Sequence, residues 1–171
     1  LGEDGTFAFG EQSIADNPEF YRLRIANQII NVSIDSTETV TFKASYPTMA
    51  SAYEVSGSDN CAKIKELALL QQGLQARVNA IAGSPSLGVD AVEDSIDKVL
   101  TAYKDNVKRN YIFKEPMKAY SYFALFQTVA LGNRQALIFN PRSNEADIKV
   151  YAAVATSWDT YYPNAERGKN L

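Results

Sequence analysis

The side chains of this chain that could do chemistry are limited by the absence of histidine and by the presence of a single cysteine, Cys61. Histidine titrates near neutrality and is the commonest metal ligand, so its absence removes Ser-His and Cys-His nucleophile pairs and the common zinc sites. The lone thiol cannot form an internal disulfide, and we expect it to be a small buried apolar residue. We therefore predict a protein that is not an enzyme, with no catalytic residue, no metal ligand and no cofactor.

Basic side chains offer a different kind of chemistry, the electrostatic recognition of a partner. The densest run of them lies late in the second expected helix and at the start of the third, and consists of Lys104, Lys108, Arg109, Lys114 and Lys118. Lys104 and Lys108 are four residues apart, which puts them on one helix face. We predict that this run docks on an acidic partner surface. The alternative is a solvated helix end whose bases complement the negative pole of the helix.

Four carboxylates, Asp90, Glu93, Asp94 and Asp97, open the second expected helix. Their spacings of three and four residues place them on adjoining surfaces, and calcium accepts such oxygen ligands. The spacing of a calcium-binding loop is not present, however, and acidic residues are favoured in the first turn of any helix. We interpret this group as complementing the helix dipole rather than as a metal site.

Aromatic residues make up 11% of the chain, with ten tyrosines, eight phenylalanines and one tryptophan. Helical spacing makes most of them core residues whose phenol oxygens reach the surface. Tyr161 and Tyr162, directly before Pro163, are expected to be exposed and to contact another subunit. The alternative use of the aromatic clusters is a site for a pigment or a small apolar ligand between helices.

Length and composition describe a folded chain of one domain: 171 residues, 46% hydrophobic and 22% charged. The net charge of -3 gives no reason to expect nucleic-acid binding. Charge divides near Gly57, because residues 1–57 carry a net of -5 and residues 58–171 a net of +2. We predict an acidic N-terminal arm over residues 1–57 and a helical body over residues 58–171.

Within the arm, strand signals occur over residues 23–34 and again over residues 39–43. Asp35-Ser36-Thr37-Glu38 is a turn sequence, so we predict a short β-hairpin that reverses there. An isolated hairpin is marginal in water, and we expect this one to pack on the body or on a partner.

The body shows four stretches with helical periodicity, at about residues 60–82, 89–111, 116–138 and 144–161. Four amphipathic helices joined by short breaks favour a mainly α fold, an up-down four-helix bundle preceded by the extended arm. The alternative is an α+β domain in which the hairpin extends into a sheet.

An extended arm followed by four helices, with no catalytic set, resembles the PsbQ-like extrinsic proteins of photosystem II. The segments that prompt this are residues 95–110 (SIDKVLTAYKDNVKRN), residues 111–119 (YIFKEPMKA) and the aromatic third helix after them. Within that group the chain looks most like the four-helix extrinsic subunit of diatoms and related red-lineage algae. The resemblance is architectural and covers the body, about two thirds of the chain.

This resemblance implies a non-catalytic subunit in the thylakoid lumen of a plastid, docked on the lumenal face of the photosystem. It also implies that the protein shields the manganese-calcium cluster and binds no cofactor of its own. The most apolar stretch, residues 120–131, is too short to span a bilayer, so we expect the protein to be peripheral to a membrane. The first residue is Leu1 rather than Met, which we interpret as a processed or truncated form.

Two other functions are consistent with the same residues. A helical body with a strand-forming arm is suited to a self-assembling coat or filament subunit, in which the arm pairs with a neighbour; its location would then be secreted or in a virion. A helical carrier of a pigment or lipid is the second.

Overall fold

The structure is a computed structural model that describes residues 2–3, 5–9, 17–35, 38–84 and 86–171. Its helices are α1 (Asp59–Ala82), α2 (Val89–Val107), α3 (Ala119–Leu125), α4 (Glu145–Tyr161) and α5 (Glu166–Lys169). Its strands are β1 (Glu19–Ile25), β2 (Gln28–Ile34), β3 (Thr41–Lys43), β4 (Glu54–Ser56), β5 (Thr128–Leu131) and β6 (Arg134–Leu137). A short 3-10 helix, η1 (Tyr46–Thr48), lies between β3 and β4, and a π-helical turn, η2 (Lys108–Ile112), continues α2. The chain is mainly α, as predicted.

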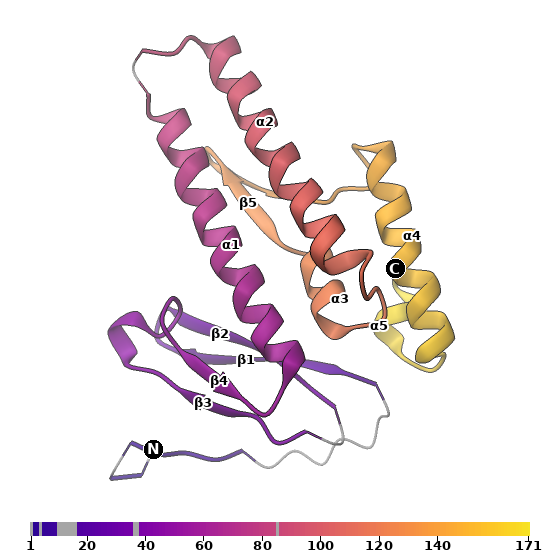
Figure 1. The fold of residues 1–171 in the computed structure, drawn as a ribbon. Coiled ribbons are helices and arrows are strands. Elements are labelled where there is room, and N and C mark those ends of the chain that lie inside the picture. Colours follow the sequence, from indigo (N-terminus) through magenta and orange to yellow (C-terminus); the bar gives the residue numbers. More distant parts are fainter. Residues whose placement is uncertain (1, 4, 10–16, 36–37, 85) are drawn as a thin grey trace.

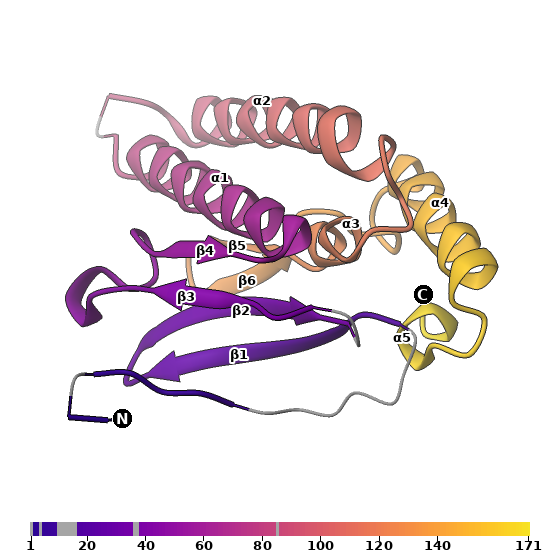
Figure 2. The same ribbon diagram turned by 60° about the horizontal axis from the view of Figure 1, so that its bottom comes forward.

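The helices and the N-terminal strands lie on opposite sides of α1. α1 and α2 form a long antiparallel pair, and α3 and α4 lie beside the lower end of α2 (Figure 1). In the rotated view of Figure 2, β1 to β4 form a layer beneath α1. α1 packs against α2, α3 and β5 as well as against β2 and β4. It is therefore the element that joins the strands to the helices.

Local sequence accounts for α1, and its predicted extent over residues 60–82 is confirmed to within a residue. The hydroxyl oxygen of Ser58 caps its start by accepting a hydrogen bond from the backbone N–H of Cys61 at 3.1 Å. Its buried apolar residues, spaced to share one face of the helix, are Ile64, Leu67, Leu74 and Val78.

α2 and α4 also begin where the sequence predicts. The side chain of Asn144 caps α4 by accepting from the backbone N–H of Ala146 at 3.0 Å. Val150, Val154 and Trp158 follow at helical spacing and are fully buried. Tyr161, near the end of the helix, is 59% exposed, in line with the exposure expected from the sequence.

The third helix, expected over residues 116–138, is where the sequence-based prediction is most clearly wrong. α3 covers only Ala119–Leu125, and the rest forms the β5–β6 hairpin. The two strands reverse at Gly132-Asn133, and Gly132 has a φ of 64°, which glycine adopts without steric cost. With α3 reduced to seven residues, the up-down four-helix arrangement remains a prediction.

The hairpin predicted in the arm is also paired differently. β2 pairs with β1, and the chain reverses at Ala26-Asn27, where Ala26 has a φ of 52°. β3 pairs with β4 across η1, so β2 and β3 belong to different two-stranded sheets. Of the predicted turn, Ser36 and Thr37 lie outside the described residues.

Two clusters of buried apolar residues hold these elements together. The larger one joins α1, α2, α3, β5 and α4 around the fully buried Leu67, Phe139 and Trp158. The smaller one lies between the β1–β2 and β3–β4 sheets and the start of α1, around Ile30, Met49 and Cys61. The sulfur of Cys61 is fully buried there and donates to the backbone oxygen of Ser33 at 3.1 Å, as expected of a structural thiol.

Gly57 fixes the passage from β4 to α1, and we predict that Gly57→Ala destabilises the protein. Its φ is 89°, and a Cβ built there would lie 2.1 Å from the backbone oxygen of Thr39. We expect a loss of at least about 2 kcal/mol in the free energy of unfolding, measured by urea denaturation. Gly73→Ala is the matched control, because Gly73 lies inside α1 with open space around it. That variant should gain roughly 0.5–1 kcal/mol, and equal effects of the two changes would show that the passage into α1 does not require glycine.

Buried tyrosines predict how stability depends on alkaline pH. Burial raises the pKa of Tyr53 from 10.0 to about 12. Burial also raises the pKa of Tyr103, Tyr111, Tyr120, Tyr122, Tyr151 and Tyr162. Above pH 10 the unfolded chain releases phenol protons that the folded chain keeps, so the free energy of unfolding falls as the pH rises.

Tyr53→Phe tests one of these groups by itself, because phenylalanine cannot ionise. Between pH 10 and pH 11.5 the variant should lose less stability in urea unfolding than the wild type. Parallel pH profiles for the two proteins would show that the phenol of Tyr53 ionises normally in the folded state.

Candidate functional site

The predicted basic run does not form one surface, because Lys104 lies inside the molecule. Its ammonium nitrogen is 2.6 Å from the Oδ2 atom of Asp147, and the two side chains are 15% and 2% exposed. The same carboxylate oxygen accepts a hydrogen bond from the backbone N–H of Asn140 at 2.8 Å. Lys104 also lies over the ring of Phe139, 5.4 Å from its centroid. The structure therefore places Lys104 in an ion pair that joins α2 to α4.

Lys108, Arg109 and Lys114 do come together at the end of α2. With Asp105 and Phe113 they line a shallow surface depression, which we call the basic hollow. The ammonium group of Lys108 lies 3.5 Å from Asp105, whereas Arg109 and Lys114 have no ion-pair partner among the described residues.

The π-helical turn η2 shapes this hollow. The backbone N–H of Phe113 donates to the oxygen of Lys108 at 2.8 Å, a span of five residues instead of the four of an α-helix. The turn is followed by Phe113, which is 50% exposed and lines the hollow with the cations. Such turns often occur at functional sites, because they change the direction of side chains within a helix. The sequence analysis did not predict this turn.

Lys118, the last member of the basic run, lies apart from the hollow. It is the N-cap residue of α3, and its backbone oxygen accepts hydrogen bonds from Ser121 and Tyr122 at 3.1 and 3.3 Å. Its side chain is half-buried. Lys118 is thus positioned by the start of α3 rather than by η2.

The predicted tyrosine pair divides in a similar way. Tyr161 is exposed at the end of α4. The ring of Tyr162 packs edge-on against Trp158 with centroids 5.0 Å apart, and burial raises the pKa of its phenol. Tyr161 is therefore available to a partner, whereas Tyr162 closes the end of the larger core.

The carboxylates at the start of α2 are exposed, and Asp94 pairs with Lys98 at 3.0 Å along the helix. Across the part of the chain that the structure describes, no three His, Cys, Asp or Glu side chains come close enough together to hold a metal ion. A search of the same residues for a helix of sufficient length and hydropathy to cross a membrane finds none.

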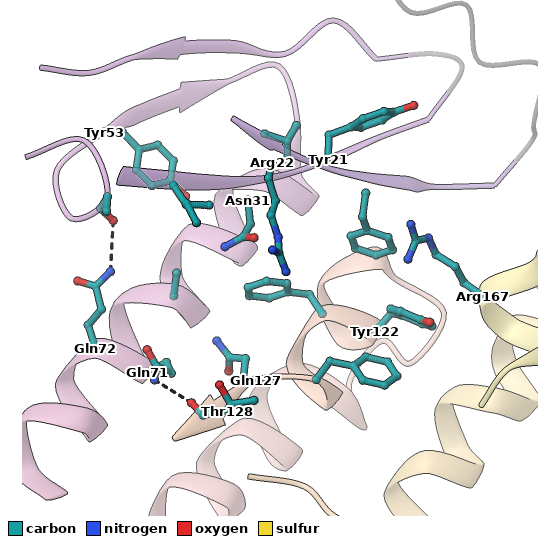
Figure 3. A pocket seen from close by; sticks show the side chains of 17 residues that line it. Tyr21, Arg22, Asn31, Tyr53, Gln71, Gln72, Tyr122, Gln127, Thr128 and Arg167 are labelled. Atoms are coloured by element: carbon teal, nitrogen blue, oxygen red, sulfur yellow. Dashed lines mark hydrogen bonds between the residues drawn. The ribbon is translucent and has the colours of Figure 1, made fainter. Parts of the chain in front are cut away.

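A cleft that the sequence analysis did not predict lies between the N-terminal strands and the helices. It has a volume of about 820 Å³ and lies between the β1–β2 hairpin on one side and α1, α3 and β5 on the other (Figure 3). Arg22 and Asn31 reach into it from the hairpin, facing Gln71 on α1 and Gln127 just before β5. These residues are far apart in the sequence, and only the packing of β2 on α1 brings them together.

Hydrogen bonds hold the walls of this cleft. Gln71 donates to the backbone oxygen of Thr128 at 2.8 Å, and Gln72 donates to that of Ala50 at 3.2 Å. Gln127 is buried, donates to the oxygen of Leu67 at 3.0 Å and accepts from the Tyr103 hydroxyl at 2.7 Å. The amides of α1 therefore tie that helix to β5 and to the segment after η1, on either side of the cleft.

Aromatic rings close one end of the cleft. Phe20 stacks on Tyr122 with centroids 5.3 Å apart, and the guanidinium of Arg167 lies over Phe20 at 4.9 Å. Tyr122 in turn contacts Phe126 and Trp158, at 5.0 and 4.8 Å between centroids. This set joins β1, α3, α4 and α5.

Comparisons of the chain with protein-family models, with curated proteins and with solved structures give no match.

The ion pair between Lys104 and Asp147 gives a prediction about stability. Lys104→Met should leave a buried carboxylate without its cation and lower the free energy of unfolding by about 3 kcal/mol or more. Lys108→Met is the matched control, because its partner Asp105 is 54% exposed, and it should cost less than about 1 kcal/mol. Urea unfolding at pH 7 measures both. A loss at Lys104 no larger than that at Lys108 would show that the buried pair contributes little.

Proposed function

We propose that the protein is a non-catalytic subunit that docks through the basic hollow on an acidic surface of a larger assembly. The observation that carries this proposal is that Lys108, Arg109 and Lys114 line one depression together with the exposed Phe113. An exposed ring and cations in one depression combine an apolar contact with charge complementarity, a pairing that anchors many protein interfaces. Tyr161 is a second exposed aromatic residue that the partner could cover.

Three features support this proposal over general surface charge. Arg109 and Lys114 remain without an ion-pair partner in the described part of the chain, although the protein as a whole is acidic. Phe113 leaves half of its ring in water, which costs free energy unless a partner covers it. Lys108 and Arg109 lie in the π-helical turn and Phe113 caps it, so a partner has little of this backbone to order on binding.

We further propose the lumenal face of photosystem II as the assembly, with the protein helping to retain calcium and chloride there. The support for this narrower proposal is the architectural resemblance to the PsbQ-like proteins over residues 95–119. The aromatic third helix no longer adds to it, because that segment is a short helix followed by a hairpin.

Cosedimentation with salt-washed photosystem II membranes from a diatom tests both proposals. We expect binding at about 50 mM salt and release at about 1 M, since exposed charges are screened over a few ångström at the higher value. Reversing three charges in the hollow, with Lys108→Glu, Arg109→Glu and Lys114→Glu together, should weaken binding at least tenfold. Phe113→Ala should weaken it without changing the dependence on salt.

The matched control reverses three exposed bases elsewhere, with Lys98→Glu, Arg134→Glu and Lys149→Glu, and it should leave binding within about twofold. An equal loss in both triple variants would mean that overall charge, not the hollow, governs binding. Failure of the wild type to bind these membranes would remove photosystem II as the assembly. A protein that elutes alone from its native extract at low salt would contradict docking itself.

A further inference from the structure

The cleft between the β1–β2 hairpin and the helices has the size and the lining of a small-molecule site. Its volume of about 820 Å³ falls within the range of roughly 300–1,000 Å³ that ligand pockets occupy. It is distinct from the basic hollow at the C-terminal end of α2, because the two share no lining residue.

The charge of the cleft is one-sided. Arg22 and Arg167 line it, whereas no Asp or Glu is among the described residues that line it. Arg167 already has partners, because its guanidinium lies over Phe20 and 3.6 Å from a carboxylate oxygen of Glu19. Arg22 forms no hydrogen bond or ion pair with any residue that the structure describes. Arg22 is exposed to solvent at the cleft, and a guanidinium without a carboxylate partner favours an anion.

The pairing of the two strands explains why Arg22 faces the cleft. Arg22 lies directly opposite Asn31 in the antiparallel β1–β2 register, so both side chains project from the same face of the hairpin. Both point toward α1 in Figure 3, whereas the neighbouring Tyr21 points away. Asn31 also lacks a hydrogen-bond partner within the described residues. A guanidinium and an amide side by side supply several donors in one place.

The rest of the cleft is suited to the body of a ligand rather than to a second charge. Phe123 and Phe126 of its wall offer apolar surface, and the ring of Phe126 is 43% exposed. The glutamines across the cleft are neutral, and Gln71 and Gln127 already use part of their amides in hydrogen bonds to the backbone. Among the described lining residues Arg22 is the cation without an ion-pair partner, and one such cation beside neutral amides matches the single charge of a carboxylate better than a doubly charged phosphate.

We propose that this cleft binds a small organic acid, with its carboxylate on Arg22 and Asn31 and its aromatic or aliphatic body against Phe123 and Phe126. The guanidinium fork and the carboxylate form two parallel hydrogen bonds, and the amide of Asn31 donates a third. This inference is independent of docking through the basic hollow, because no residue contributes to both sites.

Isothermal titration of the full chain with 4-phenylbutyrate tests the proposal. We expect saturable binding with a Kd below about 1 mM. Arg22→Gln should weaken this binding at least tenfold, and the uncharged 4-phenylbutanamide should bind the wild type at least tenfold more weakly. Phe126→Ala should weaken binding of 4-phenylbutyrate several-fold by removing apolar contact.

Arg24→Gln is the matched control. Arg24 lies two residues further along β1, carries the same charge and donates to the backbone oxygen of Ala26 at 2.8 Å outside the cleft. It should leave the affinity within about twofold, as should the triple charge reversal in the basic hollow. Equal losses at Arg22 and Arg24, equal affinity for the acid and its amide, or no saturable binding to the wild type would each overturn the proposal.

Discussion

The structure depends on the burial of α1 from two sides. Ile64, Leu67, Leu74 and Val78 face the larger core with α2, α3 and β5, while Cys61 faces the smaller core beneath the N-terminal strands. If α1 were buried only against the other helices, the two-stranded sheets would have no buried surface to pack on. Two-stranded sheets by themselves are marginal in water. The strands β1 to β4 are therefore stable because α1 offers them a second buried surface.

This two-sided burial also creates the cleft. The hairpin β1–β2 meets α1 near the start of the helix, and α3 and β5 pack on α1 from the other side. The space between them is lined from both layers and is bridged at one end by Phe20 and Tyr122. The arm is thus a wall of a potential binding site as well as an extension of the helical body.

A second constraint divides the basic residues into structural and available ones. The pair between Lys104 and Asp147 anchors α4 to α2, and it takes one cation out of the predicted docking run. Directly after α2 ends, the π-helical turn carries the next two cations, Lys108 and Arg109, and is followed by the exposed Phe113. The basic residues that form one run in the sequence therefore have two roles in the structure. Lys104 forms an ion pair with the distant Asp147, whereas the bases of the basic hollow remain at the surface.

The sequence by itself determined the elements whose signals are local. The apolar residues of α1 and α4 recur at helical spacing, so the prediction of these helices needed no tertiary information. The caps that the structure shows, Ser58 and Asn144, are equally local to the helices they begin. The β5–β6 hairpin carried a local signal too, Gly132-Asn133 between two short apolar runs, but the aromatic periodicity before it favoured a longer helix.

Tertiary structure alone decided the features that join distant residues. Strand pairing across η1, the partner of Lys104 forty-three residues away and the meeting of Arg22 with Gln71 and Gln127 all depend on which buried surfaces pack together. Packing buries residues that are neighbours in space but not in sequence, so residue spacing along the chain does not predict these contacts. The local sequence thus determines which helices form and which side chains they carry. The exposure, the partner and the role of each side chain follow from tertiary packing.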